Sequence, residues 1–99
     1  MKMLWITCNE SVGEEITEIL DRCGVSGYSV IQDVLNKDNK RGRSHWDNAV
    51  FPGKNWSFMI FCRDENACSI VETLREFSSR SYVQKAGIKI FMNDAEEII

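Results

Sequence analysis

The chain has 99 residues, of which 43% are hydrophobic and 27% charged, and its formal net charge is −3 at pH 7. This length predicts one domain over residues 1–99, with a core modest enough that oligomerisation often completes it. No segment approaches the roughly 18 consecutive apolar residues of a membrane span, so we expect no transmembrane segment. The opening residues, MKMLWITCNE, lack the long apolar region and cleavage site of a signal peptide.

The first half of the chain alternates between strand and helix patterns. Residues 2–8, KMLWITC, are rich in apolar and aromatic side chains and predict a strand. A helix should follow, with Ser11 and Glu14 as its capping box and Gly24 as its left-handed terminator. Its apolar face repeats at helical spacing through Val12, Ile16, Ile19, Leu20 and Cys23. Residues 27–37 then alternate in the manner of a second strand.

The second half repeats the same order. Residues 56–63, WSFMIFCR, form the most apolar run and predict a buried central strand. Asp64 should cap a helix that extends to Phe77, followed by a connection over 78–86 and a last strand over 87–93. The order βαββαβ predicts an α+β, ferredoxin-like fold, a four-stranded antiparallel sheet with two helices on one face. The first and third strands would be central.

The second face of this sheet would remain bare in a monomer. Four apolar side chains are candidates for it: Trp5, Phe58, Ile60 and Phe91. An exposed apolar face of this size usually indicates association.

The connection between the second and third strands, residues 38–55, is far longer than the about two to five residues of an ordinary hairpin loop. Residues 36–55 include five Lys or Arg residues and only two Asp residues, whereas the rest of the chain has a net negative charge. This distribution favours a local anionic ligand or an acidic partner, and argues against broad nucleic-acid binding. The segment DNKRGR is expected to be mobile, and SHWDNAVFPGKN to fold back through Trp46, Val50 and Phe51.

Four residues of this loop are candidates for partner binding. Arg41 and Arg43 could each contact phosphate or carboxylate groups, or simply be solvated. Trp46 could stack on a base or anchor the loop by packing. His45 could titrate, donate to a phosphate or bind a metal.

The cysteines at 8, 23, 62 and 68 form no C-x-x-C motif. Reduced, partly buried thiols are the simpler interpretation and indicate a cytoplasmic protein. A redox or soft-metal pair formed by Cys8 and Cys62 is the alternative, and with His45 and carboxylates it would make a metal-responsive trimer.

The layout resembles the PII signalling family and its PII-like relatives. The matching pieces are GYSV at 27–30, the long loop, and KIFMNDAEEII at 89–99, with Asp94 where Pro is usual. The resemblance implies a homotrimeric regulatory protein, not an enzyme, that binds an adenine nucleotide or another small anion between subunits. The loop at 38–55 corresponds to the family's T-loop and would engage an unknown target protein.

Three cleft residues follow from the resemblance. Ser29 lies where the family has a Thr that contacts the adenine, and Lys89 matches a Lys on the phosphate side. Lys85 precedes it in a segment that corresponds to the family's phosphate loop, although Ile88 occupies a position where Gly is usual. The loop holds no Tyr for modification, and the Arg pair that follows the family's E-E-x-I ending is not found up to Ile99.

Overall fold

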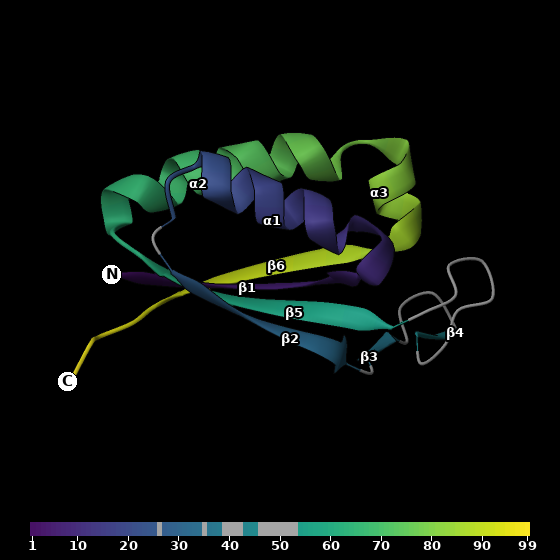
Figure 1. Ribbon diagram of the computed structural model, residues 1–99, viewed down its shortest axis with the longest axis horizontal. Helices are drawn as coiled ribbons and strands as arrows, with labels where there is room; N and C mark the ends of the chain where they lie inside the picture. Colours follow the sequence, from purple (N-terminus) through teal and green to yellow (C-terminus); the bar gives the residue numbers. More distant parts are fainter. Residues whose placement is uncertain (26, 35, 39–42, 46–53) are drawn as a thin grey trace.

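A computed structural model describes residues 1–25, 27–34, 36–38, 43–45 and 54–99 (Figure 1). Its main sheet has four antiparallel strands in the order β2-β5-β1-β6, which confirms the predicted ferredoxin-like fold. The strands are β1 (Lys2–Asn9), β2 (Tyr28–Val34), β5 (Asn55–Cys62) and β6 (Ile88–Asp94). The helices are the 3-10 turn η1 (Glu10–Val12), α1 (Gly13–Arg22), α2 (Asp64–Ser78) and α3 (Ser81–Ala86).

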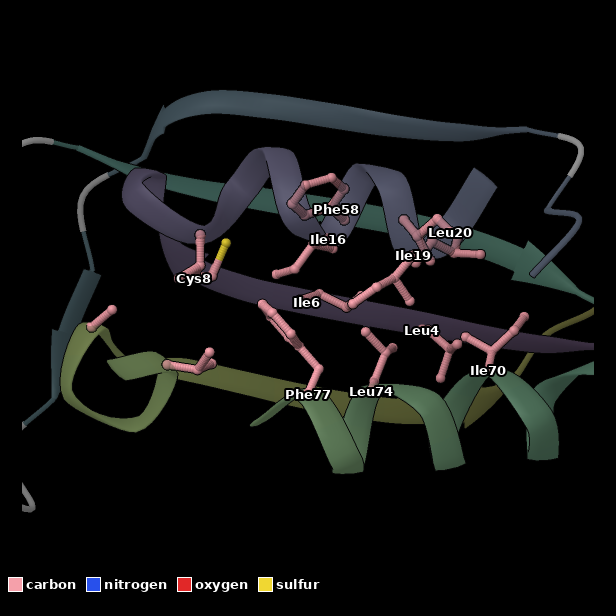
Figure 2. Close-up of a cluster of buried hydrophobic side chains, with 14 residues drawn as sticks. Leu4, Ile6, Cys8, Ile16, Ile19, Leu20, Phe58, Ile70, Leu74 and Phe77 are labelled. Atoms are coloured by element: carbon pink, nitrogen blue, oxygen red, sulfur yellow. The ribbon is translucent and has the colours of Figure 1, made fainter. Parts of the chain in front are cut away.

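The two most apolar strands, β1 and β5, are central as predicted. Within the described ranges, α1 and α2 lie side by side over one face of the sheet, and α3 closes one end of the same layer (Figure 1). Side chains alternate along β1, so that every second one points under the helices. The core between the layers is a single apolar cluster (Figure 2): Leu4, Ile6 and Cys8 from β1, Phe58 from β5, Ile16, Ile19 and Leu20 from α1, and Ile70, Leu74 and Phe77 from α2.

The helix starts differ from those predicted. Asn9, not Ser11, caps the first turn, because its Oδ1 accepts a hydrogen bond from the Ser11 backbone N–H at 3.0 Å. Asp64 is the first residue of α2 rather than its cap, and its carboxylate lies 2.9 Å from the Met1 ammonium. Gly24 does take the left-handed conformation expected of it, with φ +75°.

Residues 81–86 form α3, where the sequence predicted a plain connection. This helix is only 6 residues long, and only Val83 and Ala86 on it are buried. Two apolar residues do not establish a helical period, which explains why the pattern was missed.

The chain between β2 and β5 also departs from the prediction. β2 ends at Val34 after a bulge between Ile31 and Val34, where Asp33 adopts φ +60°. A second, two-stranded sheet follows: β3 (Asn36–Asp38) pairs with β4 (Arg43–His45). Of the segment DNKRGR, only its first and last residues, Asp38 and Arg43, are described, and they pair with each other. The mobility predicted for the residues between them lies outside the described residues. The anchoring predicted for Trp46, Val50 and Phe51 lies outside the described residues.

Gly13 lies where a helix and a strand come into close contact. A Cβ atom built on Gly13 would come within 2.3 Å of the Trp56 indole ring. Trp56 itself packs against the core and lies 6.2 Å from Phe58 between ring centroids. The glycine therefore makes room for the indole at the start of α1.

We predict that Gly13→Ala destabilises the fold, although Ala is the better helix former by about 1 kcal/mol. Forcing a methyl group into the indole should cost roughly 1–3 kcal/mol of unfolding free energy, measured by urea denaturation. Glu18→Ala, on the same helix, is the control and should change little. In a Trp56→Leu background the penalty of Gly13→Ala should shrink; an equal penalty there would show that the indole is not its cause.

Candidate functional site

The sheet face opposite the helices carries large apolar side chains. On the central strands these are Met3 and Trp5 of β1 and Met59 and Phe61 of β5, which alternate with the buried core residues. Phe61 is 49% exposed, and on the outer strand β6 Phe91 is 62% exposed. Within the described part of the chain, the α-helices lie over the other face (Figure 1). Among the residues that the structure describes, the predicted bare apolar face is therefore present.

Two of the four residues predicted for this face are on the other one. Trp5 and Phe91 face each other in the β1–β6 ladder and belong to the bare face. Phe58 and Ile60 are both 0% exposed, because they pair with Ile6 and Leu4 and point under the helices.

Ser29 and Lys89 lie on opposite edges of the sheet. Ser29 is in β2 and pairs with Met59, whereas Lys89 is in β6 and pairs with Thr7. Three strand spacings of about 4.8 Å separate them, so they are at least roughly 14 Å apart. One chain therefore does not bring Ser29 and Lys89 to the same small ligand.

The start of β2 is held against the helical layer, which orients Ser29. The Tyr28 hydroxyl donates to Asp21 Oδ1 at 3.1 Å, and the Tyr28 ring packs 6.2 Å from Phe58. Because neighbouring residues of a strand point to opposite faces, Ser29 is directed to the bare face. It is exposed there, at an edge that a second molecule can reach.

Lys85 and Lys89 lie on either side of the turn between α3 and β6. Lys85 is in the last turn of α3, and both lysines are exposed. Gly87 makes the turn with φ +100°, and its carbonyl accepts a hydrogen bond from Asn9 N–H at 3.2 Å. Ile88, at the position of the family's usual Gly, is half-buried and packs on the core.

The loop candidates are only partly described. Arg43 and His45 are at the two ends of β4, where their backbones pair with Asp38 and Asn36. Arg41 and Trp46 lie outside the described residues. At its far end the loop is joined to the domain by a hydrogen bond of 2.9 Å from Glu10 N–H to the Lys54 carbonyl.

Asn9 and Glu10 thus connect the loop base to the turn that carries the two lysines. Asn9 donates to Gly87 and Glu10 donates to Lys54 through consecutive backbone amides. Asn9 is also only 4% exposed and pairs with Asn55, the first residue of β5. The two segments are therefore joined through the backbone of these two residues.

Sequence reasoning missed two hydroxyl residues beside Lys89. Thr7 pairs with both Ser57 and Lys89, and the Thr7 and Ser57 Oγ atoms are 3.5 Å apart. The sequence shows only that each of two apolar strands contains one hydroxyl residue, Thr7 in β1 and Ser57 in β5. Their proximity becomes apparent only from the strand register, which pairs them directly.

The Cys8–Cys62 pair, which the sequence left as the alternative to free thiols, does not form. Cys8 lies opposite Trp56 and Cys62 opposite Lys2, at the two ends of the β1–β5 ladder. They are roughly 20 Å apart, at about 3.4 Å per residue. Burial also raises the pKa of the Cys8 thiol to about 12, which disfavours the thiolate that binds metals. The residues that the structure describes contain no group of three or more His, Cys, Asp or Glu side chains able to hold a metal ion.

The described residues thus form a ferredoxin-like sheet with one bare face, a long insertion between β2 and β5, and polar candidates on opposite edges. The sequence model of the nitrogen regulatory protein P-II family matches residues 1–99, and the chain belongs to that family. Its members are signalling regulators. No curated protein sequence matches the chain significantly.

Several solved structures share the fold. CPII from Thiomonas intermedia K12, a nitrogen regulatory PII-like protein bound to ADP, AMP and bicarbonate, is 19% identical with a TM-score of 0.70, over 95% of this chain and 88% of that one. The apo form of CPII is 20% identical with a TM-score of 0.69, over 93% of this chain and 85% of that one. A PII-like signaling protein from Thermus thermophilus is 18% identical with a TM-score of 0.64, over 93% of this chain and 83% of that one. Among the described residues no helix is long and apolar enough to cross a membrane.

Proposed function

We propose that the protein is a cytoplasmic, homotrimeric regulator that binds an adenine nucleotide between subunits and signals to a target protein through residues 38–55. The observation that carries this proposal is the placement of Ser29 and Lys89 on opposite edges of one sheet. Two copies placed edge to edge would bring the Ser29 of one next to the Lys89 of the other.

The bare sheet face supplies the driving force for assembly. Met3, Trp5, Met59 and Phe61 cover its centre, and Phe91 extends the apolar surface to the β6 edge. Burying apolar surface contributes about 25 cal/mol per Å², so a face of this kind favours association once three copies enclose it.

The two edges suit the two ends of a nucleotide. The Ser29 hydroxyl can donate to or accept from a base, whereas Lys85 and Lys89 supply positive charge for phosphates. CPII, which has a similar fold, is bound to ADP, AMP and bicarbonate in one structure. Ile88 stands where the family has a Gly, and a glycine lets the backbone approach a ligand closely. Because this phosphate segment lacks that glycine, we expect a preference for ADP or AMP over ATP.

The loop can respond to such a ligand because its base is hydrogen-bonded to the same junction as the Gly87 turn. A ligand shifts a loop between states only if it contacts those states differently. Changes at the lysines would reach Lys54, the described end of the loop, through Asn9 and Glu10. The partner-binding candidates Arg41, Arg43, His45 and Trp46 belong to the same loop.

We predict that Phe91→Glu abolishes the trimer without unfolding the subunit. Phe91 is 62% exposed in the single chain, so a charge there costs little until a neighbouring copy buries it. The oligomer mass should fall to that of a monomer by light scattering with unchanged circular dichroism. Met92→Glu is the matched control, since Met92 is 51% exposed on the opposite face of the same strand. A trimer that survives Phe91→Glu would exclude the bare face as the interface.

Nucleotide binding is tested by titration calorimetry of the assembled protein with ADP, AMP, ATP and bicarbonate. Lys89→Ala should weaken ADP binding by about tenfold or more, because a charge-assisted contact to phosphate is lost. Arg75→Ala, which removes a cation from the last turn of α2, should leave the affinity unchanged. Wild-type protein that binds none of these ligands would refute the proposed function.

A further inference from the structure

A row of three polar residues crosses the bare sheet face beside the loop base. Ser57 of β5, Thr7 of β1 and Lys89 of β6 are direct neighbours in the two ladders, and we call them the polar row. Directly opposite residues in antiparallel strands share a face, with Cβ atoms about 5 Å apart. The three side chains therefore form one continuous strip.

The polar row is confined to one end of the face. Moving along the central strands away from the loop, the next rows pair Met59 with Trp5 and Phe61 with Met3. On this face of the two central strands, hydroxyl side chains thus occupy only the row nearest Asn55, where the loop rejoins the sheet. Lys89 at its outer end lies two residues after the Gly87 turn.

Both hydroxyl groups are largely shielded from solvent, and the one long contact between them leaves hydrogen-bonding positions open. Ser57 is 8% exposed and Thr7 is half-buried, and their Oγ atoms are 3.5 Å apart, which is the outer limit of a hydrogen bond. A hydroxyl has one proton and two acceptor positions, so one of the two uses its proton in this contact. Both hydroxyls can donate to a third atom when the long contact between them opens. Two sheltered donors next to a lysine ammonium favour one kind of ligand atom, the oxygen of an oxyanion.

A purely structural role for the hydroxyls predicts a different behaviour. Thr and Ser side chains facing each other across strands often contribute modestly to sheet stability. Such a pair would not need a lysine in the same row, nor a place at the edge of an apolar assembly face. It would also affect folding and not ligand affinity, so the two roles are separable.

We propose that the polar row is an oxyanion subsite in which the hydroxyls of Thr7 and Ser57 donate to the same anionic group that Lys89 attracts. The inference rests on the proposed function, since Lys89 is its phosphate-side residue. It adds two residues to that site and places its anionic end on the sheet, between the loop base and the Gly87 turn. The anion is a nucleotide phosphate or a free bicarbonate ion, which have oxyanion chemistry in common.

The test compares substitutions that remove only the hydroxyl. Thr7→Val and Ser57→Ala should each weaken ADP binding by about tenfold, the usual loss for a hydrogen bond to a charged group. Thr7→Ser keeps the hydroxyl and should retain wild-type affinity. Thr73→Val, which removes a hydroxyl from α2 far from the row, is the matched control. Thermal unfolding without ligand shows whether the fold is unchanged.

Titrations with bicarbonate alone and with AMP identify the source of the anion. If Thr7→Val weakens AMP and ADP alike and bicarbonate does not bind, the row holds a nucleotide phosphate. If bicarbonate binds by itself and Thr7→Val abolishes this, the row holds the free ion. Both results support the subsite.

Two results would overturn the proposed subsite, and only one of them would also overturn the proposed function. If Lys89→Ala loses ADP while Thr7→Val and Ser57→Ala bind it within about twofold of wild type, the subsite is wrong and the proposed function stands. If the wild-type protein binds neither nucleotide nor bicarbonate, the subsite and the proposed function are both wrong.

Discussion

Strand β1 is hydrogen-bonded to β5 on one side and to β6 on the other, and this double pairing determines both faces of the sheet. Leu4, Ile6 and Cys8 point under the helices and are at most 2% exposed. The alternating Met3 and Trp5 point the other way, toward the face proposed for assembly. Because the side-chain period of a strand is two, a shift of one residue in either ladder would exchange the two sets. The core and the proposed interface therefore depend on the same register.

Much of the fold follows from periodicity, and the failures have local causes. The two central strands were predictable because they are the most apolar runs, and α1 and α2 because their apolar residues recur at helical spacing. Phe58 and Ile60 were assigned to the wrong face because a strand that is apolar throughout shows no alternation to read. Only pairing with Ile6 and Leu4 determines their direction. The cap at Asn9 and the hairpin of β3 and β4 depend on contacts that sequence spacing does not encode.

The candidate site was less predictable from the sequence than the fold. Ser29 and Lys89 came from a resemblance, and their position on opposite edges follows from the strand order once the fold is known. The alternative of a Cys8–Cys62 pair fails because both residues end apolar runs, and antiparallel pairing carries such ends to opposite ends of the ladder. Thr7 and Ser57 were missed since isolated hydroxyl residues are ordinary in strands. Their proximity to each other and to Lys89 is a property of the register alone.

The separation of Ser29 from Lys89 is the central claim, because it requires each site to be built from two chains. It is tested by mixing Ser29→Ala and Lys89→Ala subunits that carry different tags, isolating the mixed trimers and measuring their ADP affinity and stoichiometry. In a cyclic trimer of either composition, one interface joins an intact Ser29 to an intact Lys89. The account predicts one site of wild-type affinity per mixed trimer and none in either parent trimer. Mixed trimers that bind as poorly as both parents would contradict it, because a site within one chain is not repaired by mixing.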